Sequence, residues 1–137
     1  MKLTTIGTGT GAPHASRVCA GHLVEAGDVK LLLDCGNGVV HRMATLNMQW
    51  SDITHVAITH FHADHVADLP MLIFAWRWGQ LPPRAAPITL IGPPGFKELM
   101  QRLSAAFGSW VLDPGYPVFI QEFEPGSEIA LGSENEV

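Results

Sequence analysis

A six-residue segment, His60-Phe61-His62-Ala63-Asp64-His65, constrains this chain more than any other feature of its sequence. It follows residues 53–59, which are rich in β-branched side chains and therefore predict a strand. In an extended segment alternate side chains share a face, so we expect His60 and His62 to converge while Phe61 turns into the core. Where the chain bends into a helix, Asp64 and His65 should leave together in another direction. The segment therefore predicts a strand-to-helix junction that presents two pairs of donors.

Imidazole and carboxylate groups in this density indicate a metal site. They form a ligand set typical of zinc, which iron and manganese also accept. Two ions about 3.5–4 Å apart can share a hydroxide and clamp the oxygens of a displacement, so we expect hydrolysis. Scattered structural histidines are the alternative, and this spacing makes it the weaker interpretation. The remaining histidines are expected to have structural or solvated roles: His14, His22, His41 and His55.

The periodicity of the chain predicts a sheet layered with helices, an α/β or α+β class. Gly27-Asp28 between two strand-like segments indicates an antiparallel hairpin near the N-terminus. No repeat or linker divides the chain, so residues 1–137 are predicted to form a single domain. The predicted strands are 2–6, 21–26, 29–34, 53–59, 88–91 and 118–123, and the predicted helices are 39–46, 65–79 and 96–107.

Composition narrows the classes of function. The chain is 47% hydrophobic and 15% charged, as expected of one globular domain, and its net charge of −5 comes from glutamates in residues 122–136. The sequence has no cluster of Lys and Arg of the kind that indicates nucleic-acid binding. The longest apolar run is far below the roughly 20 residues of a membrane span, and the N-terminus has no leader pattern, so cytoplasmic residence is expected. Cys19 and Cys35 are too few for a disulfide framework and are expected to be free.

The segment Thr59 to His65 resembles the HxHxDH motif of the metallo-β-lactamase superfamily. Three flanking segments resemble its ribonuclease Z-like branch and the phosphodiesterase relatives of that branch: Gly7-Thr8-Gly9-Thr10-Gly11-Ala12-Pro13 with Arg17, Leu33-Asp34-Cys35-Gly36, and Gly92-Pro93-Pro94-Gly95. The resemblance runs the length of the chain. It implies the N-terminal half of an αββα sandwich, with a mostly antiparallel or mixed sheet and flanking helices. It also implies two zinc ions and metal-assisted hydrolysis, commonly of phosphodiesters.

The resemblance also implies roles for individual residues. His60 and His62 match ligands of a first metal, and Asp64 and His65 match ligands of a second. Asp64 also matches a catalytic, proton-handling group. Asp34 matches a buried aspartate that supports the metal loop and orients histidine ligands, a role compatible with capping the end of the sheet. The substrate-binding residues are unknown, because Arg17 fits a substrate contact and an ion pair with a neighbouring carboxylate equally well.

The sequence departs from the branch in three places. Ala67-Asp68 stand where a glycine is usual, which adds an acidic group near the expected metals, and Asn37 replaces an acidic residue of the tRNA-processing members. No histidine follows His65, although the superfamily takes further ligands from later strands. A catalytic zinc normally has three protein ligands, so we expect weak or absent metal occupancy. The chain is therefore expected to be the truncated N-terminal half of a longer protein and inactive alone.

Three functions remain open. The first is a two-metal phosphodiesterase or ribonuclease Z-like hydrolase acting on a phosphodiester substrate of unknown identity. The second is a thioester or lactam hydrolase of the same superfamily. The third is a non-catalytic metal-binding or structural half-domain that self-associates. Because half of a sandwich leaves an apolar face exposed, we also expect a homodimer or larger assembly, and no membrane partner.

Overall fold

A computed structural model describes residues 1–132 of the chain. The six strands form one sheet in the order β1-β2-β3-β4-β5-β6. The strands are β1 (Lys2–Gly7), β2 (Gly21–Ala26), β3 (Val29–Leu33), β4 (His55–Ala57), β5 (Ile88–Gly92) and β6 (Val118–Glu122). The helices are α1 (Val39–Thr45), α2 (Ala63–Val66), α3 (Leu69–Trp78) and α4 (Phe96–Phe107), with 3-10 turns η1 (Trp50–Asp52) and η2 (Ser109–Val111).

The sheet is mixed, as the sequence indicated. Strands β1 to β3 pair antiparallel, and β2 turns into β3 through Gly27, whose φ of 56° suits a tight hairpin. Strands β3 to β6 pair parallel. Parallel neighbours need crossover connections, and here the helices provide them. The mixed class with flanking helices is thereby confirmed.

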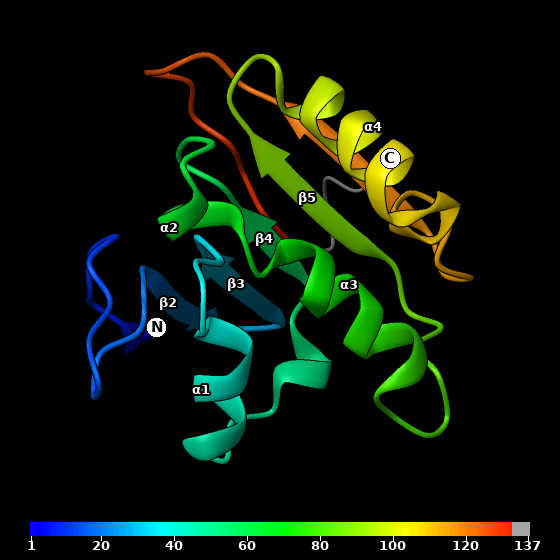
Figure 1. Cartoon of the computed structure of the whole chain (residues 1–137). Coiled ribbons are helices and arrows are strands. Elements are labelled where there is room, and N and C mark those ends of the chain that lie inside the picture. The colour runs from blue at the N-terminus through cyan, green and yellow to red at the C-terminus, as the bar shows by residue number, and fades with distance from the viewer. Residues whose placement is uncertain (133–137) are drawn as a thin grey trace.

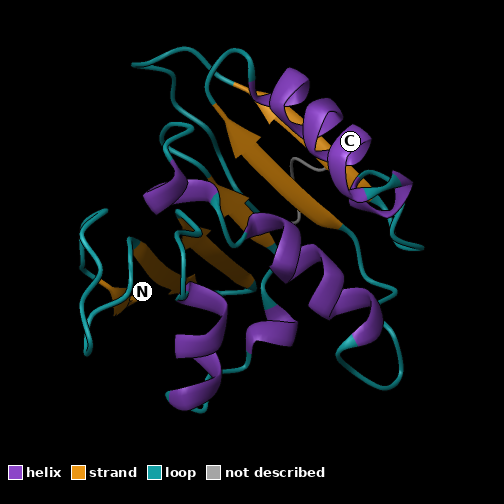
Figure 2. Ribbon diagram, in the orientation of Figure 1, coloured by secondary structure: helices purple, strands orange, loops and turns teal. Residues whose placement is uncertain are grey.

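The helices α1, α3 and α4 cover one face of the sheet (Figures 1 and 2). Leu32, Val56 and Leu90 are aligned across β3, β4 and β5 and are fully buried in the core under these helices. Trp76 of α3 and Phe96 of α4 are also fully buried there. This shared apolar layer fixes where the loops at the carboxyl ends of β3, β4 and β5 meet.

Helix α4 has the predicted bounds because its ends carry strong local signals. Gly95 and Gly108, with φ values of 95° and 126°, flank it in conformations that favour glycine. The carboxylate of Glu122 accepts hydrogen bonds from the backbone of Gly95 (3.1 Å) and Lys97 (2.7 Å). A side chain from β6 therefore caps the start of the helix that packs beside it.

The single helix predicted at 65–79 is two helices, which corrects the prediction. α2 begins at Ala63, two residues early, and α3 begins at Leu69 with Pro70 in its first turn. Proline has no backbone N–H and favours the start of a helix, which explains the break.

None of the helices within residues 1–132 has the length and apolarity that crossing a membrane requires. Cytoplasmic residence stays a prediction.

The strand predicted at 53–59 is also shorter than expected, because only His55–Ala57 pair as β4. The backbone of Ile58 still donates to the carbonyl of Ile91 at 2.8 Å, after which the chain leaves the sheet. Phe61 therefore does not turn into the core. Its side chain is 37% exposed and stacks over Phe96, with ring centroids 6.2 Å apart.

Candidate metal centre

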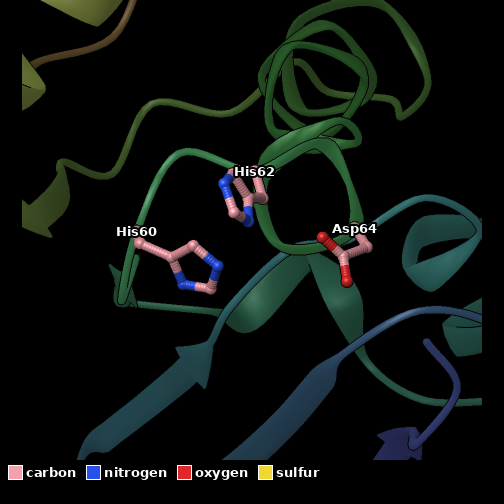
Figure 3. Close-up of side chains that lie close together, drawn as sticks. All are labelled: His60, His62 and Asp64. Carbon is pink, nitrogen blue, oxygen red and sulfur yellow. The ribbon is translucent and has the colours of Figure 1, made fainter. Parts of the chain in front are cut away.

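The loop that joins β4 to α2 carries His60 and His62, and the start of α2 carries Asp64 (Figure 3). His62 precedes α2 in an extended conformation, with φ −65° and ψ 147°, and Asp64 lies in the first turn of the helix. The change from extended chain to helix directs these three side chains into one space, whereas the sequence pattern predicted that Asp64 would leave in another direction from His60 and His62. The anion-favouring N-terminus of α2 suits the carboxylate of Asp64 in that turn.

His60, His62 and Asp64 each offer a ligand atom, and these atoms all lie within 4.8 Å of one another. The rings of His60 and His62 are 4.8 Å apart between centroids, in an edge-to-face arrangement. Figure 3 shows the three side chains pointing toward one another. Within residues 1–132 no other group of three such side chains is found. This spacing is close enough for the three donors to share a metal ion.

His65 adjoins the same cluster from the next turn of α2. Its Nε2 lies 3.5 Å from Oδ2 of Asp64, and its ring lies 4.1 Å from that of His60 between centroids. The structure therefore brings all four predicted ligands together. His65 neighbours both Asp64 and His60, so the two expected pairs of donors form one continuous cluster.

Asp34 ties this cluster to the end of the sheet. It is 6% exposed, and its backbone has a positive φ of 57°. That carboxylate accepts hydrogen bonds from the backbone of Thr59 (2.7 Å), the hydroxyl of Thr59 (2.9 Å) and Nδ1 of His65 (2.7 Å). The contacts suit both expected roles of Asp34, because the carboxylate caps the end of β4 and orients a predicted ligand.

The segment after β3 packs directly on the backbone of α2. Cys35 N donates to the carbonyl of His65 at 2.8 Å. A Cβ on Gly36 would lie only 2.0 Å from the carbonyl oxygen of Asp64. Glycine is required at this close approach, which explains a glycine directly after Cys35.

The N-terminal glycine loop lies beside the cluster. A Cβ built on Gly11 would be 3.9 Å from Oδ2 of Asp64, which is ordinary contact distance. The loop is held back on itself by the hydrogen bond from Gly9 N to the carbonyl of Val18 at 2.8 Å. Backbone N–H groups in such a loop can approach an anion, although a plain tight turn has the same shape.

The histidines outside the cluster have other surroundings. His14 contacts Ser16 through Nδ1, at 3.1 Å from the backbone N and 3.2 Å from the hydroxyl. His55 is 3% exposed, and its Nδ1 lies 2.7 Å from the hydroxyl of Thr54. Neither joins a group of three potential ligands within the described residues. Their structural roles stay predictions that agree with these contacts.

Asp68, expected to add an acidic group near the metals, has a different partner. Its Oδ2 accepts a hydrogen bond at 3.0 Å from the backbone of Val40, in the first turn of α1. Burial raises the pKa of this carboxyl above its ordinary value, against the lowering effect of the backbone donors. Asp68 therefore holds α1 against α3 and does not extend the cluster.

Thr59 was not singled out as a site residue by the sequence pattern, although it contacts two of the predicted site residues. Besides its bonds to Asp34, its hydroxyl lies 3.0 Å from Nδ1 of His60. The sequence contains a related signal: the chain pairs Thr with His twice, at Thr54-His55 and at Thr59-His60. The second pair contacts the carboxylate of Asp34 through the Thr59 hydroxyl.

Comparisons with known proteins agree with this geometry. Residues 1–107 match the family described as "Anti-Pycsar protein Apyc1". Ribonuclease Z of Mycobacterium sp. (strain KMS) is 38% identical over 118 residues, which cover 86% of this chain and 40% of that protein. The chain thus spans about two fifths of the length of this curated relative.

Two solved structures share the fold. The metallo-β-lactamase fold protein YhfI from Bacillus subtilis superposes with a TM-score of 0.72 at 26% identity, over 95% of this chain and 48% of YhfI. The short form of human tRNase Z superposes with a TM-score of 0.74 at 25% identity, over 93% of this chain and 47% of that protein. Both similarities cover nearly all of this chain and about half of the solved protein.

Proposed function

This chain belongs to the family described as anti-Pycsar protein Apyc1 and has the metallo-β-lactamase fold of ribonuclease Z-like proteins, and from that premise we propose that it forms the metal-binding part of a phosphodiester hydrolase. The observation that carries the proposal is the convergence of His60, His62 and Asp64 within 4.8 Å. With His65 beside Asp64, the cluster has three imidazoles and a carboxylate, which match the ligand chemistry of zinc. The fold and the donor set therefore support the same activity.

In this proposal His60 and His62 hold one divalent ion, and Asp64 and His65 hold a second. When bound, such ions polarise a phosphodiester and lower the pKa of water. The chain's own residues orient the donors and handle the proton. Asp34 fixes the ring of His65 through Nδ1, which leaves Nε2 directed toward Asp64. We assign proton transfer to Asp64, because it is the carboxylate of the cluster and its Oδ2 lies 3.5 Å from Nε2 of His65.

The number of donors limits what this chain does alone. Four donors shared between two ions provide two protein ligands for each, whereas a catalytic zinc usually has three and an open position. We therefore expect weak zinc occupancy and little turnover from the 137-residue chain alone. Iron and manganese, which accept the same donors, are the other candidate ions.

The glycine loop favours a phosphodiester over the thioester or lactam alternative. A Cβ built on Gly11 would lie 3.9 Å from Oδ2 of Asp64, so the glycine loop borders the cluster at Gly11. Amide groups in such loops bind phosphate oxygens by donating several hydrogen bonds to one anion. A thioester or lactam offers fewer acceptor oxygens to such a loop.

The test combines metal content with hydrolysis of bis(p-nitrophenyl) phosphate, using the wild-type chain, Asp64→Asn and His41→Ala. His41 is an exposed histidine on α1 and serves as the matched control. The proposal expects zinc-dependent hydrolysis, however slow, that Asp64→Asn abolishes and His41→Ala preserves. Zinc binding without any hydrolysis would favour the non-catalytic metal-binding alternative. Failure to bind zinc would contradict both.

We also propose that the chain self-associates through the sheet face opposite the helices. Leu3, Val24, Leu31, His55, Thr89 and Phe119 are aligned across the six strands on that face. The edges of this row are open, since Leu3 is 63% and Phe119 is 54% exposed. Exposed apolar surface of this kind favours association. Sedimentation velocity should show a dimer or larger species, and a stable monomer at micromolar concentration would contradict it.

A further inference from the structure

A hydroxyl group connects the buried carboxylate of Asp34 to the first predicted metal ligand. Thr59 Oγ1 donates to Oδ2 of Asp34 at 2.9 Å and lies 3.0 Å from Nδ1 of His60. The backbone N–H of the same residue donates to Oδ1 of Asp34 at 2.7 Å. Two bonds to one carboxylate therefore hold Thr59 in place directly beside His60.

The direction of these bonds determines where His60 carries its proton. A hydroxyl has a single hydrogen, and a carboxylate only accepts. If Thr59 donated to His60 instead, Oγ1 and Oδ2 of Asp34 would face each other as two acceptors at 2.9 Å. The favourable arrangement has Thr59 donating to Asp34 and accepting from His60. It requires the proton of the neutral imidazole to be on Nδ1, which leaves the lone pair of Nε2 free.

The same carboxylate sets the second ring. Nδ1 of His65 lies 2.7 Å from Oδ2 of Asp34, so the neutral ring donates from Nδ1 and leaves Nε2 free toward Asp64. Asp34 thus acts on His65 directly and on His60 through one hydroxyl. Both rings present Nε2 as the donor atom, although the two histidines are assigned to different ions.

We propose that Thr59 is a positioning residue of the metal centre. Its hydroxyl donates to the carboxylate of Asp34 and accepts from His60, and these bonds select the tautomer of His60 that presents Nε2 to a divalent metal ion. This proposal rests on the proposed function for the identity of the ligands. It adds to the metal centre a residue, Thr59, that is not itself a metal ligand. Fixing the tautomer and orientation of a ligand histidine in advance strengthens metal binding, because the free ring otherwise samples unproductive states.

The first test measures zinc affinity by competition with a chromogenic chelator for three variants. Thr59→Val removes the hydroxyl at nearly constant shape and is expected to weaken zinc binding by about 10–100-fold, the usual effect of losing such a support. Thr59→Ser keeps the hydroxyl and should bind zinc as the wild type does. Thr54→Val is the matched control, because Thr54 makes the equivalent contact with His55 outside the cluster. Equal affinity for Thr59→Val and the wild type would overturn the proposal.

The second test needs neither zinc nor a variant. Long-range nitrogen–proton correlation spectra of the metal-free wild type report which ring nitrogen of each histidine carries the proton. The proposal expects His60 protonated on Nδ1, and a Thr59→Val chain in which this bias is lost. A wild-type His60 protonated on Nε2 would overturn it, whether or not Thr59→Val folds. Failure of the wild type to bind zinc would instead defeat the proposed function, since the tautomer is measured in the apo protein.

Discussion

The two ends of β4 carry the same dipeptide in opposite settings. At the amino end, Thr54 Oγ1 lies 2.7 Å from Nδ1 of His55, and at the carboxyl end Thr59 Oγ1 lies 3.0 Å from Nδ1 of His60. His55 is 3% exposed, whereas His60 is half-buried at the edge of a loop. The local sequence is therefore not what distinguishes a structural histidine from a candidate metal ligand.

The polar groups at the amino end of β4 satisfy one another. The Thr54 hydroxyl bonds to the backbone of Lys30, and the buried guanidinium of Arg84 donates to the carbonyls of Ser51, Ile53, Ala86 and Pro87. Arg84 also stacks 4.8 Å from the ring of Trp76. Burial lowers the pKa of Arg84 and raises that of Tyr116 beside it. These contacts stabilise the fold and leave Arg84 committed to backbone acceptors.

The carboxyl end differs because its polar groups converge in a partly exposed region. The carboxylate of Asp34 orients the ring of His65, and Asp64 and three imidazoles face the same region. What marks the Thr-His pair at the carboxyl end as a candidate ligand site is the converging group of donors around it and its partial exposure. We therefore expect substitutions at the carboxyl end to change zinc affinity and substitutions at the amino end to change the free energy of unfolding.

The largest effect is expected from His60→Ala. Removing a ligand should weaken zinc binding by at least about 100-fold, since changes in outer-shell partners alone cost 10–100-fold. His55→Ala should leave zinc affinity unchanged in the folded protein, although it creates a cavity under the sheet. Isothermal titration with zinc measures both. Equal losses in the two variants would remove the distinction between the two ends.

Arg84→Ala tests the amino end. It leaves four backbone carbonyls without their donor, so we expect the free energy of unfolding to fall by roughly 3 kcal/mol. Arg102→Ala is the matched control, because Arg102 pairs with Glu98 on the exposed side of α4 and should cost below about 0.5 kcal/mol. Urea denaturation gives both values. A small effect of Arg84→Ala would show that water replaces the guanidinium readily.

Asp34→Asn sharpens the account of the carboxyl end. Asparagine tolerates the positive φ at this position, so the backbone should keep its conformation. Zinc affinity is expected to fall by about 10-fold or more, because the amide no longer accepts equally from Thr59 and His65. Asp52→Asn, at an exposed carboxylate paired with Lys30, is the control. An Asp34→Asn chain with wild-type affinity would exclude the carboxylate as a support.

Asp68→Asn should have the smallest effect, and its sign depends on pH. Burial raises the pKa of Asp68 above about 3.8, so the folded state binds a proton more readily than the unfolded state. The wild type therefore gains stability as the pH falls through the raised pKa. At neutral pH the variant should be more stable, by about 1 kcal/mol or less, provided its amide oxygen still accepts from Val40.

Thermal denaturation of Asp68→Asn from pH 7 down to pH 4 should show this advantage disappearing with acid. Asp28→Asn, at an exposed carboxylate in the β2–β3 turn, should show no comparable trend. An advantage for Asp68→Asn that grew on acidification would contradict the direction of the pKa shift.

Much of the fold could be predicted because its signals are local. Glycines at both ends of α4 and the Gly27 hairpin mark boundaries that depend on neighbouring residues alone. The break between α2 and α3 was missed, although Pro70 was visible, because strong apolar periodicity concealed it. Phe61 was misplaced because alternation was extended beyond Ala57, where pairing of β4 ends.

The sequence predicted the candidate ligands and the supporting position of Asp34, but not the contacts of Asp68 and Thr59. Four candidate ligands lie within six residues, so their proximity follows from chain connectivity. The partners of Asp68 and Thr59 do not, because Val40 and Asp34 are 28 and 25 residues away. These contacts depend on how β3, β4 and α1 pack against α2 and α3, which the sequence alone does not show.

The most direct test of the account is anomalous diffraction at the zinc edge from crystals of the chain grown with zinc. The account predicts an anomalous peak among His60, His62, Asp64 and His65, and none beside His55. Zinc found only at other histidines, with these four side chains directed apart, would contradict the claim that the carboxyl end of β4 is a metal centre.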